Sequence, residues 1–205
     1  MTMSEFNTEK LLKIIKEQVP DITLTGEVER LSGGNINIVW RAKGEERNVI
    51  IKYAPPYIAS NPGVPLSDTR IHFEARALQL LNTGGKLYHL AGAEIRPPKL
   101  YACDKEHSLI FMEDVGAFKV LGEAIGSPKI IGERLGNFIG KLHKVTFRKR
   151  ELGKTFHNSE IQKVRNRLQY QPAHTYADLE KVKLVNEIKK RNQDLGNRLL
   201  QGGRC

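Results

Sequence analysis

The strongest constraint on the fold is one change of hydrophobic periodicity, near residue 116 of the 205-residue chain. Before this point, segments with strand-type patterns are separated by turns, and two helical segments lie among them. After it, the apolar spacing is helical throughout. Strands that are followed by helices alone are typical of an α+β protein with two lobes. We therefore predict two domains, residues 1–115 and 116–205.

The first domain is predicted to hold a five-stranded antiparallel sheet with one main helix. An amphipathic helix over residues 8–19 opens the chain, and Pro20 ends it. The main helix is expected to run from Ser67, its N-cap, to Leu81, after a proline-rich loop at residues 54–67. The strands are expected at residues 22–31, 36–41, 49–53, 97–103 and 108–112.

The second domain is predicted to be helical and basic. Helices are expected at residues 131–145, 159–169 and 176–200. Of the formal net charge of +10, residues 144–205 carry +9, from 15 basic and six acidic side chains. These charges are spread along helical sequence with few aromatic residues. This pattern favours a solvated face, or a face for an acidic partner segment, over binding of nucleic acid.

The composition excludes several classes of protein. With 40% hydrophobic residues the chain can bury a core, but no apolar run approaches the roughly 20 residues of a membrane-spanning helix. The two cysteines, Cys103 and Cys205, cannot form a disulfide framework and lack metal-ligand spacing. The N-terminus has no apolar signal segment, so we expect a reducing, cytoplasmic setting and no membrane partner.

The first candidate site is the run Ser32, Gly33, Gly34 and Asn35, between two predicted strands. Glycines allow the backbone to approach a ligand closely, and exposed amide groups suit phosphate oxygens. A simple hairpin turn would explain the same residues.

Two charged residues and one strand end complete the candidates. Lys52 ends an apolar strand, and an inward-facing lysine there needs an anionic partner, which Glu74 on the main helix could supply. Both residues could instead be ordinary surface residues. Met112, Glu113 and Asp114 end the last strand, where backbone groups could contact an adenine edge or simply close the strand.

Taken together, these features resemble the aminoglycoside-phosphotransferase-like family of small-molecule kinases, which have the protein-kinase-like fold. The resemblance covers about residues 21–143 and is carried by residues 32–39, 49–58, 65–70, 73–78 and 111–114. Within the family, the chain is most similar to the methylthioribose kinases.

The resemblance implies transfer of phosphate from ATP to a hydroxyl of a sugar-like substrate, such as methylthioribose or an aminoglycoside, with Mg²⁺ in a full-length form. It implies that Lys52 contacts the nucleotide phosphates and that Glu74 orients Lys52. It also implies that Ser32, Gly33, Gly34 and Asn35 cover the phosphates, while Met112, Glu113 and Asp114 lie along the adenine.

The departure from the family concerns its catalytic loop, which carries His-Gly-Asp and is followed by acidic metal ligands. The present sequence contains no His-Gly-Asp. We therefore expect no catalytic or metal-binding residue in this chain, and an inactive N-terminal fragment whose helices are the first of an incomplete C-lobe. The alternative is a non-catalytic nucleotide-binding or regulatory module, a pseudokinase.

Overall fold

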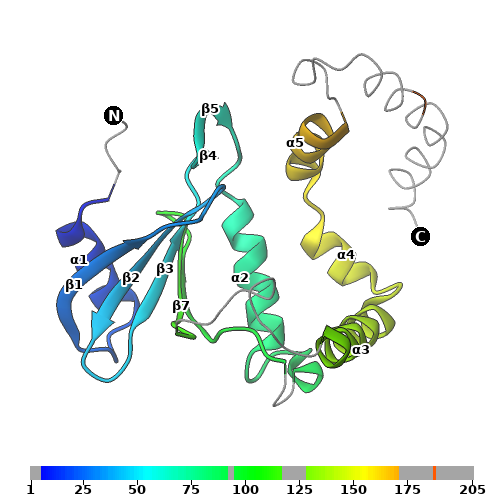
Figure 1. Cartoon of the computed structure of the whole chain (residues 1–205), viewed down its shortest axis with the longest axis horizontal. Helices are drawn as coiled ribbons and strands as arrows, with labels where there is room; N and C mark the ends of the chain where they lie inside the picture. The colour runs from blue at the N-terminus through cyan, green and yellow to red at the C-terminus, as the bar shows by residue number, and fades with distance from the viewer. Residues whose placement is uncertain (1–5, 92–94, 117–127, 171–186, 188–205) are drawn as a thin grey trace. The chain divides into compact units, whose positions relative to one another are not determined.

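The computed structural model describes residues 6–91, 95–116, 128–170 and 187 (Figure 1). The chain forms two compact units, Met1–Lys144 and Val145–Cys205. The first contains the sheet, and the second contains α4 (Arg150–Phe156) and α5 (Ser159–Tyr170). The predicted division into domains at residue 116 stays a prediction.

Five antiparallel strands form the main sheet, in the spatial order β1-β2-β3-β7-β6. Their bounds are β1 Leu24–Leu31, β2 Ile38–Gly44, β3 Val49–Tyr53, β6 Leu100–Asp104 and β7 Leu109–Glu113. The predicted α+β class and five-stranded antiparallel sheet are therefore confirmed.

Helices α1 and α2 cover opposite faces of the sheet (Figure 1). The apolar stripe of α1 (Thr8–Gln18) packs with alternate residues of β3, namely Val49, Ile51 and Tyr53. Buried residues of α2 (Arg70–Leu81) pack with alternate residues of β7, Ile110 and Met112. Because neighbouring residues of a strand point to opposite faces, Lys52 lies on the face that α2 covers.

Two predictions around α2 are wrong. The proline-rich segment 54–67 is not a plain loop, because it contains a short hairpin of β4 (Tyr57–Ile58) and β5 (Asn61–Pro65). Ser67 does not cap α2. The helix begins at Arg70 after Thr69, and the Ser67 hydroxyl bonds instead to the Thr69 hydroxyl at 2.8 Å.

The remaining helices follow the predictions more closely. Helix α3 (Pro128–Thr146) and helix α5 contain the expected segments 131–145 and 159–169. Helix α4 was not expected from the sequence. The helix predicted at residues 176–200 lies outside the described residues, apart from Glu187. Across the part of the chain that the structure describes, no helix has the length and apolar character needed to cross a membrane.

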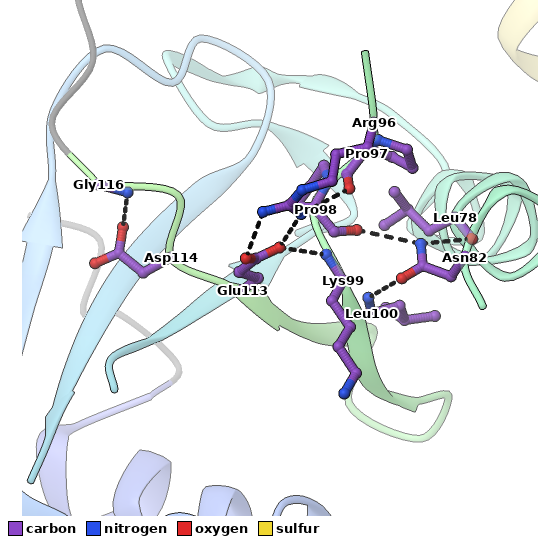
Figure 2. A network of polar contacts seen from close by, with 10 residues as sticks. All are labelled: Leu78, Asn82, Arg96, Pro97, Pro98, Lys99, Leu100, Glu113, Asp114 and Gly116. Carbon is purple, nitrogen blue, oxygen red and sulfur yellow. Dashed lines mark hydrogen bonds and ion pairs between the residues drawn. The ribbon is translucent and has the colours of Figure 1, made fainter. Parts of the chain in front are cut away.

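Asn82 joins the end of α2 to the start of β6 (Figure 2). Its Nδ2 donates to the Leu78 carbonyl at 2.7 Å and to the Pro98 carbonyl at 3.2 Å. The Leu100 amide donates to Asn82 Oδ1 at 3.1 Å. One side chain thus satisfies three backbone groups, which otherwise would lose hydrogen bonds in a half-buried setting.

We expect Asn82→Ala to lower the free energy of unfolding by about 1–2 kcal/mol, since it leaves partly buried backbone groups without partners. Urea denaturation followed by the fluorescence of Trp40 measures the loss. Thr83→Ala, at the next and exposed residue, is the control and should change stability by less than about 0.5 kcal/mol. Equal effects of the two substitutions would show that the Asn82 side chain does not carry this junction.

Candidate functional site

Lys52 and Glu74 form an ion pair between β3 and α2. Lys52 Nζ lies 2.7 Å from Glu74 Oε1 and 2.8 Å from Glu74 Oε2. The contact that the sequence suggested is therefore present. The side chains keep 25% and 35% of their exposure, so a ligand can reach them. A pair this exposed contributes little to stability, about 1 kcal/mol or less.

The ammonium group retains capacity to bind a further anion. Lysine has three N–H donors, and two of them suffice for the two Glu74 oxygens. Glu74 is held by α2, whose residues Ile71, Ala75 and Leu78 are buried against the sheet. The carboxylate therefore fixes the position of the amine and leaves it able to contact a phosphate.

The glycine run lies at the same end of the sheet as Lys52. The pairing of β2 with β3 puts Val39 opposite Lys52, and residues 32–37 directly precede this part of β2. Ser32, Gly33, Gly34 and Asn35 are all exposed.

Glycine is required at two positions of this run. Gly33 has φ +94°, in the left-handed region, and a Cβ on Gly34 would lie 2.5 Å from the Asn37 carbonyl oxygen. The run is thus a tight, backbone-exposing turn, of the kind that suits an anion.

An apolar stretch of the same sheet face leads from Lys52 to the end of β7. On this face Ile50 pairs with Met112, and the next pair, Val49 with Glu113, marks the end of β7, with Val49 on the face that α1 covers. Three residue steps separate Val49 from Lys52, so the end of β7 lies about 10 Å from Lys52 along the sheet. The candidates therefore form two groups: the glycine run with Lys52 and Glu74, and the strand end at Met112, Glu113 and Asp114.

Glu113 is bound by its own neighbours (Figure 2). The Arg96 guanidinium donates to both of its carboxylate oxygens, at 2.5 and 2.8 Å, and the Lys99 amide donates to Oε2 at 3.0 Å. The hydrogen bond from Arg96 lowers the pKa of Glu113, and burial opposes this effect only in part.

Asp114 is also bound, by two residues of the β2–β3 hairpin and by the amide of Gly116. Arg41 Nε donates to Oδ2 at 2.7 Å, Asn48 Nδ2 donates to Oδ2 at 3.0 Å, and the Gly116 amide donates to Oδ1 at 3.0 Å. Burial alone would raise the pKa of Asp114, but these hydrogen bonds outweigh it and lower the pKa. Both carboxylates thus hold the strand end in place, so any contact with a base there would fall to backbone groups.

Sequence reasoning missed the partners Arg41, Asn48 and Arg96. Arg41 and Asp114 are 73 residues apart in the chain. No local pattern marks such a pair, because it depends on the register of β2, β3 and β7.

The arrangement combines features that suit an anion with an apolar stretch. The exposed glycine turn and the positioned ammonium lie at one end, and the apolar stretch, about 10 Å long, leads from them to the end of β7. Within residues 6–91, 95–116 and 128–170, no three His, Cys, Asp or Glu side chains come together as metal ligands. We assign Mg²⁺ no ligand among these residues.

Comparison with known proteins points to small-molecule kinases. The chain is 24% identical over 140 residues to 4-hydroxytryptamine kinase of Psilocybe cubensis, and 24% identical over 158 residues to that of Psilocybe cyanescens. These alignments cover 62% and 71% of this chain but 39% and 44% of the relatives. The chain thus spans less than half the length of the curated relatives that it matches. No family model matches it.

Solved structures are also similar, among them a protein assigned as an aminoglycoside phosphotransferase from Ralstonia eutropha. The TM-score is 0.35 and the sequence identity 19%, over 56% of this chain and 29% of the other. The sequence relatives support a small-molecule kinase-like protein.

Proposed function

We propose that the chain binds ATP and is the nucleotide-binding part of a small-molecule kinase with a protein-kinase-like fold. The observation that carries this proposal is the Lys52–Glu74 ion pair beside an exposed glycine turn. In phosphoryl transfer, a lysine held by a helix glutamate positions the phosphates and offsets their charge. Ser32, Gly33, Gly34 and Asn35 cover the phosphates, and the backbone of residues 112–114 lies along the base.

The phosphate acceptor in this proposal is a hydroxyl of a small molecule. The sequence relatives are named for 4-hydroxytryptamine, whereas the resemblance to the methylthioribose kinases favours a sugar-like acceptor such as methylthioribose. Both carry a hydroxyl, so a screen of acceptors with a full-length form of the protein, with ADP release as the readout, separates them. A non-catalytic nucleotide-binding module is the second candidate, because the chain has no His-Gly-Asp. It predicts MgATP binding without ADP release for every acceptor.

We expect MgATP to raise the melting temperature of the chain and Lys52→Ala to abolish the rise. A ligand at a free concentration of one hundred times its Kd stabilises a protein by about 2.7 kcal/mol. This corresponds to a rise of several degrees in the melting temperature. Differential scanning fluorimetry with MgATP, and with Mg²⁺ alone as a blank, measures this.

Lys43→Ala is the matched control for this experiment. Lys43 is an exposed lysine of β2 and pairs with a surface glutamate, Glu27, as Lys52 pairs with Glu74. Its loss should leave the MgATP shift intact. An undiminished shift in Lys52→Ala, or no shift in the wild-type chain, would contradict the proposed nucleotide site.

A further inference from the structure

Arg70, at the start of α2, lies where three segments of the chain meet. Its guanidinium donates to six oxygen atoms: from Nε to Asn37 Oδ1 (2.9 Å), from Nη2 to the carbonyls of Ile36 (3.1 Å) and Tyr57 (3.5 Å), and from Nη1 to those of Pro55 (2.7 Å), Leu66 (3.3 Å) and Ser67 (2.8 Å). The acceptors belong to residues 36 and 37, which directly follow the glycine run, and to both ends of the β4–β5 hairpin. A single side chain thus joins the glycine run, the hairpin and α2.

The glycine run depends on this junction because its other described anchors lie on the hairpin. The Ser60 amide donates to the Asn35 carbonyl at 2.9 Å, and the Ala59 amide donates to the Ile36 carbonyl at 3.2 Å. Strand β4 has two residues and β5 has five, and an isolated two-stranded hairpin is only marginally stable. The hairpin can therefore hold the run in place only if its own base is held.

Arg70 and Glu74 are one helical turn apart on α2, which is about 6 Å along the axis. Glu74 fixes the amine of Lys52, and Arg70 fixes the end of the glycine run. Helix α2 thus determines the position of both parts of the candidate phosphate site.

We propose that Arg70 is a positioning residue, which holds the glycine run at one fixed place relative to the Lys52 amine. This inference rests on the proposed nucleotide site, and it adds a residue that contacts no nucleotide. Lysine cannot substitute, because its ammonium is a single point and cannot reach acceptors on three segments as the planar guanidinium does.

The first test is backbone amide exchange without nucleotide. The amides of Ala59 and Ser60 report directly on the junction, because their hydrogen bonds end on Ile36 and Asn35. In Arg70→Lys we expect these two amides to exchange about tenfold faster, through local opening. The Asn82 amide, which bonds to Leu78 at the other end of α2, should exchange as in the wild type.

The second test is the affinity for MgATP, measured by calorimetry on the same variants. Arg70→Lys should weaken Kd about tenfold, since a displaced glycine run no longer meets the phosphates that Lys52 binds. Arg76→Met is the matched control, because Arg76 is an exposed arginine of the same helix. It should leave both the exchange rates and Kd unchanged.

Asn37→Ala provides a milder variant if Arg70→Lys folds poorly. It removes one acceptor of the glycine run and leaves the other five contacts of Arg70 in place. The same two amides should exchange faster, by a smaller factor. The double variant should be non-additive, because both substitutions remove the same hydrogen bond.

Two results would overturn the role of Arg70. One is wild-type exchange at Ala59 and Ser60 in both variants. The other is an acceleration that is equal at Asn82, which would indicate general destabilisation. A wild-type chain that does not bind MgATP would defeat the proposed function instead. In that case, the exchange data alone would decide whether Arg70 holds the glycine run.

Discussion

Phe111→Ala should lower the free energy of unfolding by about 3–5 kcal/mol, the usual cost of deleting a fully buried aromatic side chain. Phe111 has no exposed surface and lies in β7, between β3 and β6. It packs with the residues that α1 covers, so its removal leaves a cavity lined by several elements. A domain is stable by only about 5–15 kcal/mol, so this one change removes a large part of the total.

Urea denaturation followed by Trp40 fluorescence measures this loss. Trp40 is the single tryptophan of the chain and belongs to the same core cluster as Phe111. Phe147→Ala is the matched control, because the Phe147 side chain is 69% exposed, and we expect a change within about 0.5 kcal/mol. A loss below about 1 kcal/mol for Phe111→Ala would mean that β7 is not at the centre of the core.

The core could be predicted from the sequence where its pattern is local. Strand β3 has the bounds that its apolar run indicated, Val49–Tyr53, since a short continuous run flanked by turns leaves little choice. Pairing of strands that are distant in the sequence, such as β3 with β7, does not follow from a local pattern.

Both wrong predictions around α2 follow a local residue preference that the rest of the fold overrides. The β4–β5 hairpin contains Pro62 and Pro65, which argue against a strand, yet as an edge pair it needs few ladder hydrogen bonds. The start of α2 was placed at Ser67 because serine is a preferred cap. There the backbone carbonyls of Leu66 and Ser67 bind Arg70 instead, so tertiary contacts decided the boundary.

The candidate site, too, could be predicted from the sequence only in part. The Lys52–Glu74 contact was anticipated, because a lysine on an apolar strand needs an anionic partner and Glu74 is an acid of the next helix. The bonds of Glu113 and Asp114 were not anticipated, and they change the interpretation of that strand end. Their side chains are structural partners of Arg96 and Arg41, so the sequence could suggest the place but not how its side chains are used.

Asp114→Asn should lower the free energy of unfolding by about 2 kcal/mol at pH 7, because it removes the charge from a partly buried, hydrogen-bonded ion pair. The Asp114 side chain is 8% exposed, and Arg41, with 24% exposure, would lose this carboxylate partner, which directly follows β7. Hydrogen bonds from Asn48 and from the Gly116 amide would weaken as well. Urea denaturation at several pH values measures the difference from the wild type.

The effect of Asp114→Asn should depend on pH with a definite sign. The folded-state pKa of Asp114 lies below the usual value of 3.8, so the unfolded chain binds more protons in this range. The stabilisation is therefore complete above the unfolded-state pKa and is lost as the pH falls through the folded-state pKa. We expect the difference between wild type and variant to be constant from pH 7 to about pH 5 and to shrink below about pH 4.

The controls separate this carboxylate from the others. The lowered pKa of Glu113 adds to the acid destabilisation of both proteins, so it cancels in the difference. Asp21→Asn makes the same chemical change at an exposed residue and should leave stability within about 0.5 kcal/mol of the wild type at every pH. A wild-type minus Asp114→Asn difference that stays constant down to about pH 2.5 would show that Asp114 is not stabilised as a charged group, because that difference must vanish as the carboxylate takes up its proton.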